Sequence, residues 1–410
     1  MNILHIVAGN VRGGAARGAY WLHQGLIELD IDSNILISGK SDQYDKKVKS
    51  LSNTKLEQAI TIFRSQFDPL ILKLYKNNKG NIFSTGLIGY DFTKSDQYKQ
   101  ADIIHFHWIN SGMVNIKHLL KTDKPIVWTL RDMWPMTGGC HYSLECDGFK
   151  RNCGTCPQLG SHKKHDLSRL IYNRKLKYIP VNITIVGISN WLTEQARQSS
   201  IFKEKKCITI MNNINTDDFK KINKTLAREI LGIKTEKKII LCGSTNLKDF
   251  YKGFQKYLDA LHYLNKDDLF LCFFGNFDKN LMNNYNFDYK SFGYLNDNIS
   301  LNLVYSAADV FVAPSTQEAF GKTLAEAQCS GTPVVCFNAT GPKDIVEHKV
   351  TGYLADPFDP KLLAKGIEWV VKSPDHEQLC NNARIKVLRN FDRKIVANDY
   401  VELYKEILRK

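Results

Sequence analysis

The feature that most constrains the fold is the alternation of short apolar runs with longer helical patterns along the whole chain. The runs are continuously apolar, which is typical of parallel strands covered on both faces. They lie at 2–8, 101–108, 125–130, 182–188, 238–243, 269–274, 309–313, 333–337 and 352–355. Helical patterns such as 254–264 separate them. This alternation predicts doubly wound α/β domains.

The series of runs restarts near residue 238, after a polar, lysine-rich stretch. A chain of 410 residues is also long enough for two cores. We therefore expect one Rossmann-like domain over 1–210, a second over 211–391 and a terminal helix over 392–410. The apolar residues of this helix recur at helical spacing, so it must dock on one of the two domains.

The net charge of +14 lies almost entirely in the first half of the chain. Residues 1–210 contain 29 basic and 17 acidic side chains, whereas the remainder contains 27 and 25. Such asymmetry favours a first half that meets a lipid surface, a phosphorylated acceptor or nucleic acid, although a solvated basic face is the alternative. We see no signal peptide or membrane-spanning stretch, and expect a cytoplasmic protein, at most attached to a membrane surface.

A candidate anion site follows the expected strand 309–313. A loop with Glu318 leads into a helix that starts near Phe320 and Gly321 and carries Glu326. Ligands of open α/β sheets bind beyond the carboxyl ends of the strands, and a helix start there attracts anions. We expect a diphosphate at Phe320, Gly321 and Lys322, with the two carboxylates holding hydroxyl groups on either side.

Several stretches around this site resemble a known family. They read "PSTQEAFGKTLAEAQCSGTPVV", "GSTNLKDFYKGF", "TGPKDIVEHKVTGYLADPFDP" and, near the start, "GGAARGA". Together they are similar to the retaining glycosyltransferases of family four, which have the GT-B fold. The resemblance implies two Rossmann-like domains facing a cleft, with the terminal helix packing back on the N-terminal domain. It also implies a UDP- or GDP-type nucleotide-sugar donor.

The resemblance assigns roles to individual donor-site residues. Glu326 would bind the ribose, Glu318 the donor hexose and Lys252 the diphosphate. The arginine that the family carries before this lysine is missing, since the stretch reads Ser244-Thr245-Asn246. Gly13 and Gly14 would close over the donor phosphate, although taken alone they also fit a plain strand-to-helix turn.

The first half contributes two further catalytic candidates. His107 ends an expected strand, so either it or His105 should emerge at the cleft. Arg131 stands where many relatives carry a histidine, and it can neutralise a departing diphosphate. The neighbouring Asp132 either orients a side chain or forms a structural salt bridge. No Asp-x-Asp segment lies in an expected cleft loop, so we expect catalysis without a metal or other cofactor.

Four cysteines crowd an expected insertion over 138–160: Cys140, Cys146, Cys153 and Cys156. Their spacing is compatible with a structural zinc site, with His141 as a substitute ligand. Reduced thiols and disulfides are the alternatives, because the spacing fits no standard zinc ribbon. The segment "DMWPMTGGCHY" with the cysteines after it resembles an insertion in a branch of family four associated with surface polysaccharide assembly.

We therefore expect a hexosyltransferase of capsule, exopolysaccharide or O-antigen synthesis. Its acceptor would be a saccharide or lipid-linked saccharide, met by a basic N-terminal domain in peripheral contact with the membrane. One alternative is a nucleotide-sugar epimerase of the same fold. Another is a basic, zinc-containing nucleic-acid-binding protein, but the chain has no recognition helix or RNA-binding signature, so no nucleic-acid partner is expected.

Overall fold

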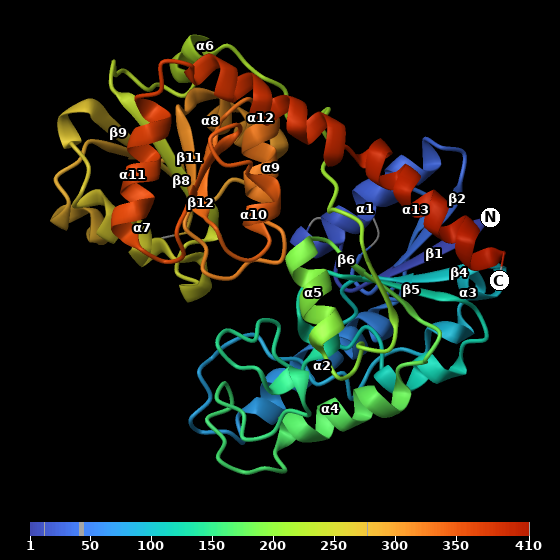
Figure 1. Cartoon of the computed structure of the whole chain (residues 1–410). Coiled ribbons are helices and arrows are strands. Elements are labelled where there is room, and N and C mark those ends of the chain that lie inside the picture. Colours follow the sequence, from blue (N-terminus) through green and yellow to red (C-terminus); the bar gives the residue numbers. More distant parts are fainter. Residues whose placement is uncertain (12, 41–44, 277, 410) are drawn as a thin grey trace. The chain divides into compact units, whose positions relative to one another are not determined.

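The computed structural model describes residues 1–11, 13–40, 45–276 and 278–409. The chain forms two compact units (Figure 1). Unit 1 consists of Met1–Asn213 and Arg393–Lys410, and unit 2 consists of Ile214–Asp392. Each unit is an α/β structure around one parallel sheet.

Unit 1 contains a seven-stranded sheet with the order β3-β2-β1-β4-β5-β6-β7. Its strands are β1 (Asn2–Val7), β2 (Asp32–Ile37), β3 (Val48–Ser50), β4 (Ile103–Phe106), β5 (Ile126–Leu130), β6 (Thr184–Gly187) and β7 (Lys206–Thr209). Its helices are α1 (Gly14–Ile27), α2 (Lys55–Leu72), α3 (Asp96–Gln100), α4 (Leu167–Tyr178), α5 (Asn190–Gln198) and α13 (Arg393–Leu408).

Unit 2 contains a six-stranded sheet with the order β10-β9-β8-β11-β12-β13. Its strands are β8 (Lys238–Asn246), β9 (Leu269–Asn276), β10 (Tyr289–Ser291), β11 (Val310–Ala313), β12 (Val334–Phe337) and β13 (Gly352–Ala355). Its helices are α6 (Lys224–Ile230), α7 (Phe254–Leu261), α8 (Asn298–Ala307), α9 (Lys322–Cys329), α10 (Pro342–Ile345), α11 (Pro360–Val371) and α12 (His376–Asn390).

Both sheets are doubly wound, and each has one point where the strand order reverses. The reversal lies between β1 and β4 in unit 1 and between β8 and β11 in unit 2. Loops that leave the carboxyl ends of two such strands diverge, which leaves room for a ligand. The prediction of two doubly wound α/β domains is confirmed. The sequence missed β2, β3, β7 and β10, all of which lie toward the sheet edges and carry polar residues.

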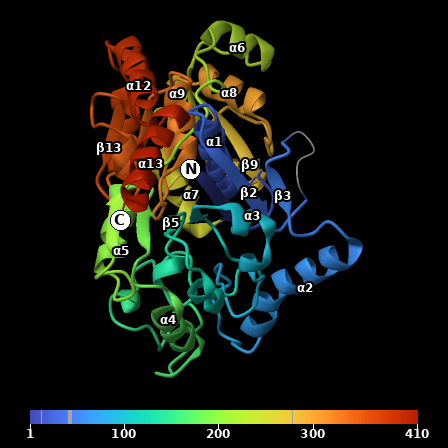
Figure 2. The ribbon, with the colours of Figure 1, turned by 90° about the vertical axis from the view of Figure 1, so that its right-hand side faces the viewer.

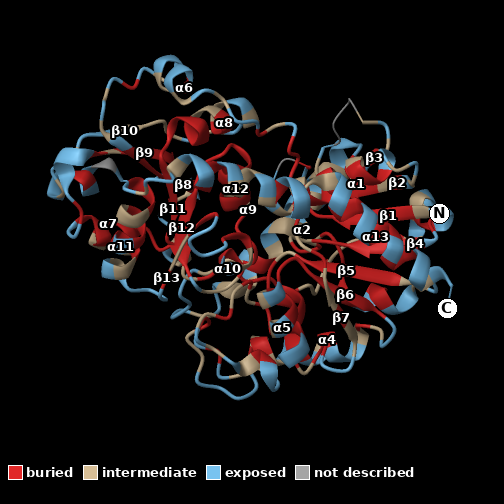
Figure 3. Ribbon diagram, turned by 45° about the horizontal axis from the view of Figure 1, so that its top comes forward, coloured by how far each residue is buried: buried red, intermediate tan, exposed pale blue. Residues whose placement is uncertain are grey.

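The strands are buried and the helices expose their outer faces, as the colouring of Figure 3 shows. The terminal helix α13 packs on α1 of unit 1. Its residues Val396, Tyr400 and Tyr404 are buried, and the Tyr404 hydroxyl lies 2.6 Å from Nδ1 of His105 on β4. The expected docking of this helix on the N-terminal unit is therefore confirmed. In the described part of the chain, no helix is long and apolar enough to cross a membrane.

Candidate functional site

The strand reversal of unit 2 brings two of the predicted donor-site residues together. Lys252 lies in the loop after β8, and Glu318 lies in the loop after β11. The Lys252 ammonium donates a hydrogen bond to the Glu318 carboxylate, and the two side chains are 23% and 17% exposed. A partly solvated pair of opposite charges at this point can exchange its mutual contact for contacts to a ligand.

A glycine allows the loop after β8 to pack closely against the end of β11. Gly253 has a φ of +66°, and a Cβ there would lie 1.9 Å from the carbonyl oxygen of Pro314. The carbonyl of Tyr251 accepts a hydrogen bond of 2.8 Å from the amide of Thr316. Glycine at position 253 is therefore required by the close approach of two backbones, and this approach places Lys252 beside Glu318.

The loop after β12 fixes the backbone of Glu318. The Gly341 amide donates to the Glu318 carbonyl at 2.9 Å, and the Glu318 amide donates to the Thr340 hydroxyl at 3.3 Å. A Cβ on Gly341 would lie 2.4 Å from the Ala319 carbonyl oxygen. Motif reasoning assigned no role to Thr340 and Gly341, although both lie in the "TGPKDI" stretch that carried part of the resemblance.

Helix α9 begins where the sequence predicts, with Gly321 as its N-cap at a φ of +106°. The positive end of this helix therefore lies immediately after the loop of Glu318. The side chain of Phe320 is buried and meets Phe391 edge to face, with ring centroids 5.4 Å apart. Phe320 is thus a core residue, and only its backbone is available to a ligand.

Glu326 lies one turn into α9 and is 2% exposed. Its Oε2 accepts a hydrogen bond of 3.2 Å from the Tyr305 hydroxyl, and its Oε1 lies 3.9 Å from Nζ of Lys322. Tyr305 was not predicted, and its only sequence signal is an aromatic position in the helix preceding β11. Four of the predicted site residues of unit 2 therefore form two pairs of opposite charge. Lys252 pairs with Glu318 before α9, and Lys322 pairs with Glu326 in the first turns of α9.

In unit 1, Gly13 and Gly14 begin helix α1 after β1. Gly13 is the N-cap, and a Cβ at either position would meet nothing within 4 Å. Protein packing therefore does not require glycine at these two positions. Gly18 differs, because a Cβ there would lie 2.6 Å from Nη1 of Arg131.

Arg131 follows β5 and is held between two side chains. Its Nη1 donates to Oδ1 of Asn212 at 2.5 Å, and its Nη2 lies 3.1 Å from Nδ1 of His107. Burial lowers the pKa of Arg131 to about 10, so the guanidinium still carries its charge at neutral pH. The structure therefore joins two of the predicted catalytic residues, Arg131 and His107, in one hydrogen-bonded group.

The expectation that His105 or His107 emerges from the sheet is wrong. Both are buried, with exposed fractions of 0% and 1%, because Tyr404 of α13 and Arg131 cover the end of β4. Burial first, and then neighbouring His105 and Arg131, hold the pKa of His107 well below its usual range. His107 can thus act on a ligand only through Arg131.

The hydrogen bonds fix the ring protons of this histidine group. A guanidinium can only donate, so Nδ1 of His107 accepts from Arg131 and its proton is on Nε2. That Nε2–H then donates to Nδ1 of His5, 2.9 Å away. Candidate metal-ligating atoms of His5, His105 and His107 lie within 4.8 Å of one another. However, both nitrogens of His105 already contact hydroxyl groups, and the adjacent Arg131 charge repels a cation.

Asp132 orients two neighbouring rings. Its Oδ2 lies 2.6 Å from Nδ1 of His141 and accepts a hydrogen bond of 2.8 Å from the indole of Trp108. The second nitrogen of His141 lies 3.0 Å from the hydroxyl of Ser84. Both ring nitrogens of His141 therefore have partners apart from the cysteines.

The four cysteines of the predicted insertion line one cavity of about 20 Å³. All four are free thiols in this structure. Near Cys140 and Cys153 lies Lys175 of α4, one of the basic residues in the positively charged first half of the chain. It is not part of a solvated basic face, because it is completely buried and donates to the carbonyls of Trp134 and Thr137. Its spacing from Ile171 and Tyr172, which place it on the buried face of α4, was the available signal.

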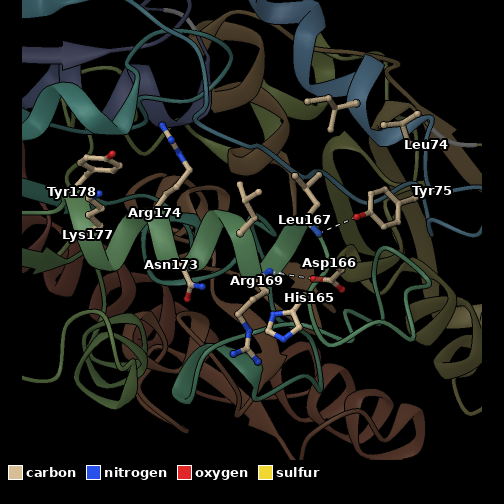
Figure 4. A pocket seen from close by; sticks show the side chains of 12 residues that line it. Leu74, Tyr75, His165, Asp166, Leu167, Arg169, Asn173, Arg174, Lys177 and Tyr178 are labelled. Carbon is tan, nitrogen blue, oxygen red and sulfur yellow. Dashed lines mark hydrogen bonds between the residues drawn. The ribbon is translucent and has the colours of Figure 1, made fainter.

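A larger groove of about 730 Å³ lies between the end of α2 and helix α4 (Figure 4). Its lining is both apolar and basic. It consists of Ile71, Leu74, Tyr75, His165, Asp166, Leu167, Arg169, Leu170, Asn173, Arg174, Lys177 and Tyr178. The Tyr75 hydroxyl accepts a hydrogen bond of 2.9 Å from the Leu167 amide, which ties the two walls together. The basic residues of this lining contribute to the charge excess of the first half, whereas the apolar wall was not predicted from the sequence.

Comparisons with known proteins agree with this geometry. Over 340 residues the chain is 27% identical to an uncharacterized glycosyltransferase of Methanocaldococcus jannaschii, covering 78% of this chain and 77% of that protein. It is 26% identical over 185 residues to the putative colanic acid biosynthesis glycosyl transferase WcaC of Escherichia coli, covering 41% and 42% of the two chains.

Among solved structures, Anabaena HepE in complex with UDP-glucose superposes with a TM-score of 0.64 at 16% identity, covering 99% of this chain and 100% of that one. This similarity shows that the fold is GT-B, as the sequence predicts. The family model described as "Glycosyl transferases group 1" matches residues 223–387, which include Lys252, Glu318 and Glu326. Over residues 223–387 the chain is therefore similar to the glycosyl transferases group 1 family.

Proposed function

We propose that this protein transfers a hexose from a nucleoside-diphosphate sugar to a lipid-linked saccharide in the synthesis of a bacterial surface polysaccharide. The observation that carries the proposal is the Lys252–Glu318 pair at the strand reversal of unit 2, immediately before the start of α9. It is supported by a relative named for colanic acid biosynthesis and by a solved structural neighbour that holds UDP-glucose.

Each donor group has a residue of suitable chemistry. Lys252 and the positive end of α9 suit the diphosphate, because a cation and a helix start both stabilise phosphate charge. Glu318 suits the hydroxyls of the hexose, and Glu326 suits those of the ribose. Donor binding would then exchange the Lys252–Glu318 contact for two contacts to the donor, one from each residue.

The reaction we propose retains the anomeric configuration and needs no divalent ion. Charge on the leaving diphosphate would be stabilised by Lys252 and the start of α9, and the leaving phosphate itself would take the acceptor proton. NMR of the product distinguishes a retained from an inverted anomer. Transfer that depends on added Mg²⁺ or Mn²⁺ would contradict the metal-independent part of the proposal.

Donor binding is tested by thermal shift against UDP-glucose, UDP-galactose, UDP-N-acetylglucosamine and GDP-mannose. A donor at 100 times its dissociation constant should stabilise the protein by about 2.7 kcal/mol. At the same donor concentration, Lys252→Met and Glu326→Gln should reduce this stabilisation to about 1.4 kcal/mol or less. Glu368→Gln is the matched control, since Glu368 forms an exposed pair with Lys372 on α11. The proposal fails if no nucleotide-sugar stabilises the protein, and release of a free epimer from donor alone would favour an epimerase instead.

A lipid-linked acceptor is supported by the surface of unit 1. Helix α2, seen at the edge of this unit in Figure 2, exposes Leu56, Ile62, Phe63 and Leu70 by 51% to 71%. The groove at its end adds Arg169, Arg174 and Lys177. Exposed apolar side chains beside basic ones are typical of helices that lie in the interface of an anionic membrane.

Sedimentation with vesicles containing anionic lipid tests this contact. The triple variant Leu56→Ser, Ile62→Ser, Phe63→Ser should release the protein from such vesicles. Ile299→Ser in unit 2 is the control, because Ile299 is 75% exposed but lies outside this surface. If the triple variant and the control sediment equally with the vesicles, the membrane contact is not made by α2.

A further inference from the structure

The lining of the cysteine cavity contains none of the residues assigned to donor binding. Cys140, Cys146, Cys153 and Cys156 all line it, and every pair among the four sulfur atoms interacts electrostatically. A volume of about 20 Å³ is close to that needed for one water molecule. The cavity therefore has room for one small ion, and the sulfur-bearing side chains of the four cysteines line it.

Backbone amides point at the sulfur atoms. The Gly148 amide donates to Sγ of Cys146 at 3.4 Å. Burial raises the pKa values of Cys153 and Cys156, and nearby amides, of Gly138 and of Gln158 and Leu159 respectively, lower them in part. Amide hydrogen bonds to sulfur stabilise a thiolate more than a neutral thiol, because they favour the charged form. These amides therefore offset part of the cost that burial places on a thiolate, although the net effect of the surroundings is to raise the thiol pKa values.

A buried lysine, Lys175, lies near two of these cysteines. Lys175 has no exposed surface, and its electrostatic partners are first Cys140 and Cys153, and then Asp132 and Asp68. In the described ranges no carboxylate lies within ion-pair distance of Lys175. An ammonium without a nearby anion is costly to bury, and a metal bound by four thiolates would supply that anion, with a net charge of about −2.

We propose that Cys140, Cys146, Cys153 and Cys156 bind one structural zinc ion, with Lys175 as the buried counter-charge. Tetrahedral ligation places sulfur atoms about 3.8 Å apart, since Zn–S bonds are about 2.3 Å long. No three of the described thiols lie within 4.8 Å of one another. Zinc binding would therefore draw the sulfur atoms inward by rotation of the cysteine side chains, and it would release their protons.

The zinc ion would stabilise one wall of the groove on unit 1. The Cys156 amide donates to Oδ2 of Asp166 at 2.9 Å, and Arg169 donates to the Cys153 carbonyl at 2.9 Å. Asp166 is the N-cap of α4. The cysteine segment, which contains little regular secondary structure, thus holds the start of the helix that lines the groove. Metal content can be measured without any transfer assay, so this proposal and the proposed function can fail independently.

The test is elemental analysis of the full-length protein, purified under reducing conditions. We expect about one zinc per chain. Cys146→Ser and Cys153→Ser should lose it, whereas Cys207→Ser, which removes a buried thiol elsewhere in unit 1, should retain it. Replacement of zinc by Co²⁺ should produce the visible absorption bands of a tetrahedral thiolate site in the parent protein and not in Cys146→Ser.

Lys175→Met tests the counter-charge with a side chain of similar length. It should weaken zinc binding by about 10- to 100-fold, as loss of an outer partner of a metal site commonly does. Iron in place of zinc, disulfides detected by mass spectrometry, or four freely reacting thiols without metal would each overturn the proposal. Unchanged zinc affinity in Lys175→Met would overturn the role of Lys175.

Discussion

Lys252 and Glu318 form an ion pair although they lie 66 positions apart in the sequence. The pair exists because β8 and β11 are neighbours in the sheet and their following loops meet at the strand reversal. Each residue therefore holds the other in place.

Replacing each partner separately should distinguish donor binding from chemistry. Lys252→Met should weaken donor binding by about 10- to 100-fold, because a hydrogen bond to a charged group is lost. Glu318→Gln should lower kcat more than donor affinity, if Glu318 contacts the hexose near the reacting bond. Calorimetry with donor and initial-rate kinetics measure the two effects. Equal loss of affinity in both variants would argue against separate roles.

Gly253→Ala should destabilise unit 2. Alanine at a φ of +66° costs about 1–2 kcal/mol, and its Cβ would also collide with the Pro314 carbonyl. The expected loss is therefore above about 2 kcal/mol in urea unfolding. A loss of less than that would show that the loop after β8 can withdraw from β11.

Gly14→Ala should have the opposite effect on stability. Its Cβ meets nothing within 4 Å, and alanine is favoured over glycine in a helix by up to about 1 kcal/mol. If Gly14 lets a phosphate approach the start of α1, the variant should transfer sugar more slowly while remaining as stable as the parent. Full activity would indicate that the glycine serves only as a turn.

Gly18→Ala should displace the guanidinium of Arg131. The added Cβ would lie 2.6 Å from Nη1 of Arg131 and 3.2 Å from Oδ1 of Asn212. We expect transfer to fall about 10- to 100-fold, as in Arg131→Lys, and the double variant to fall no further. Additive losses in this double-mutant cycle would mean that Gly18 acts independently of Arg131.

Unit 1 should lose stability below about pH 6.5. Burial holds the pKa values of His5, His105 and His107 well below 6.5 in the folded state, so the unfolded chain binds more protons as the pH falls. Each histidine contributes a slope of at most about 1.4 kcal/mol per pH unit. His5→Gln should reduce the slope by that amount, and the exposed His162→Gln should not. Hydrogen exchange of the backbone amides in β1 and β4, followed between pH 5 and 7, measures this dependence of stability on pH.

The sequence by itself determined the α/β class, the main strands and the start of α9, because these depend on local periodicity and on Gly321 at a left-handed position. It also predicted donor-site roles for Lys252, Glu318 and Glu326, since each lies in a recognisable motif. The short edge strands β3 and β10 carry three residues each, too few for a periodic signal.

Only the tertiary structure decided which residues meet. Burial of His107, its contact with Arg131, and the Tyr305–Glu326 hydrogen bond depend on packing between elements distant in sequence. Lys175 shows most clearly that the sequence alone does not decide which side chains are buried. A lysine usually indicates a solvated surface, but here the helix face that carries it turns inward, and its side chain interacts with the thiols of Cys140 and Cys153. The sequence determines which charges the chain carries, whereas the folded packing decides which of them are buried and therefore need a partner.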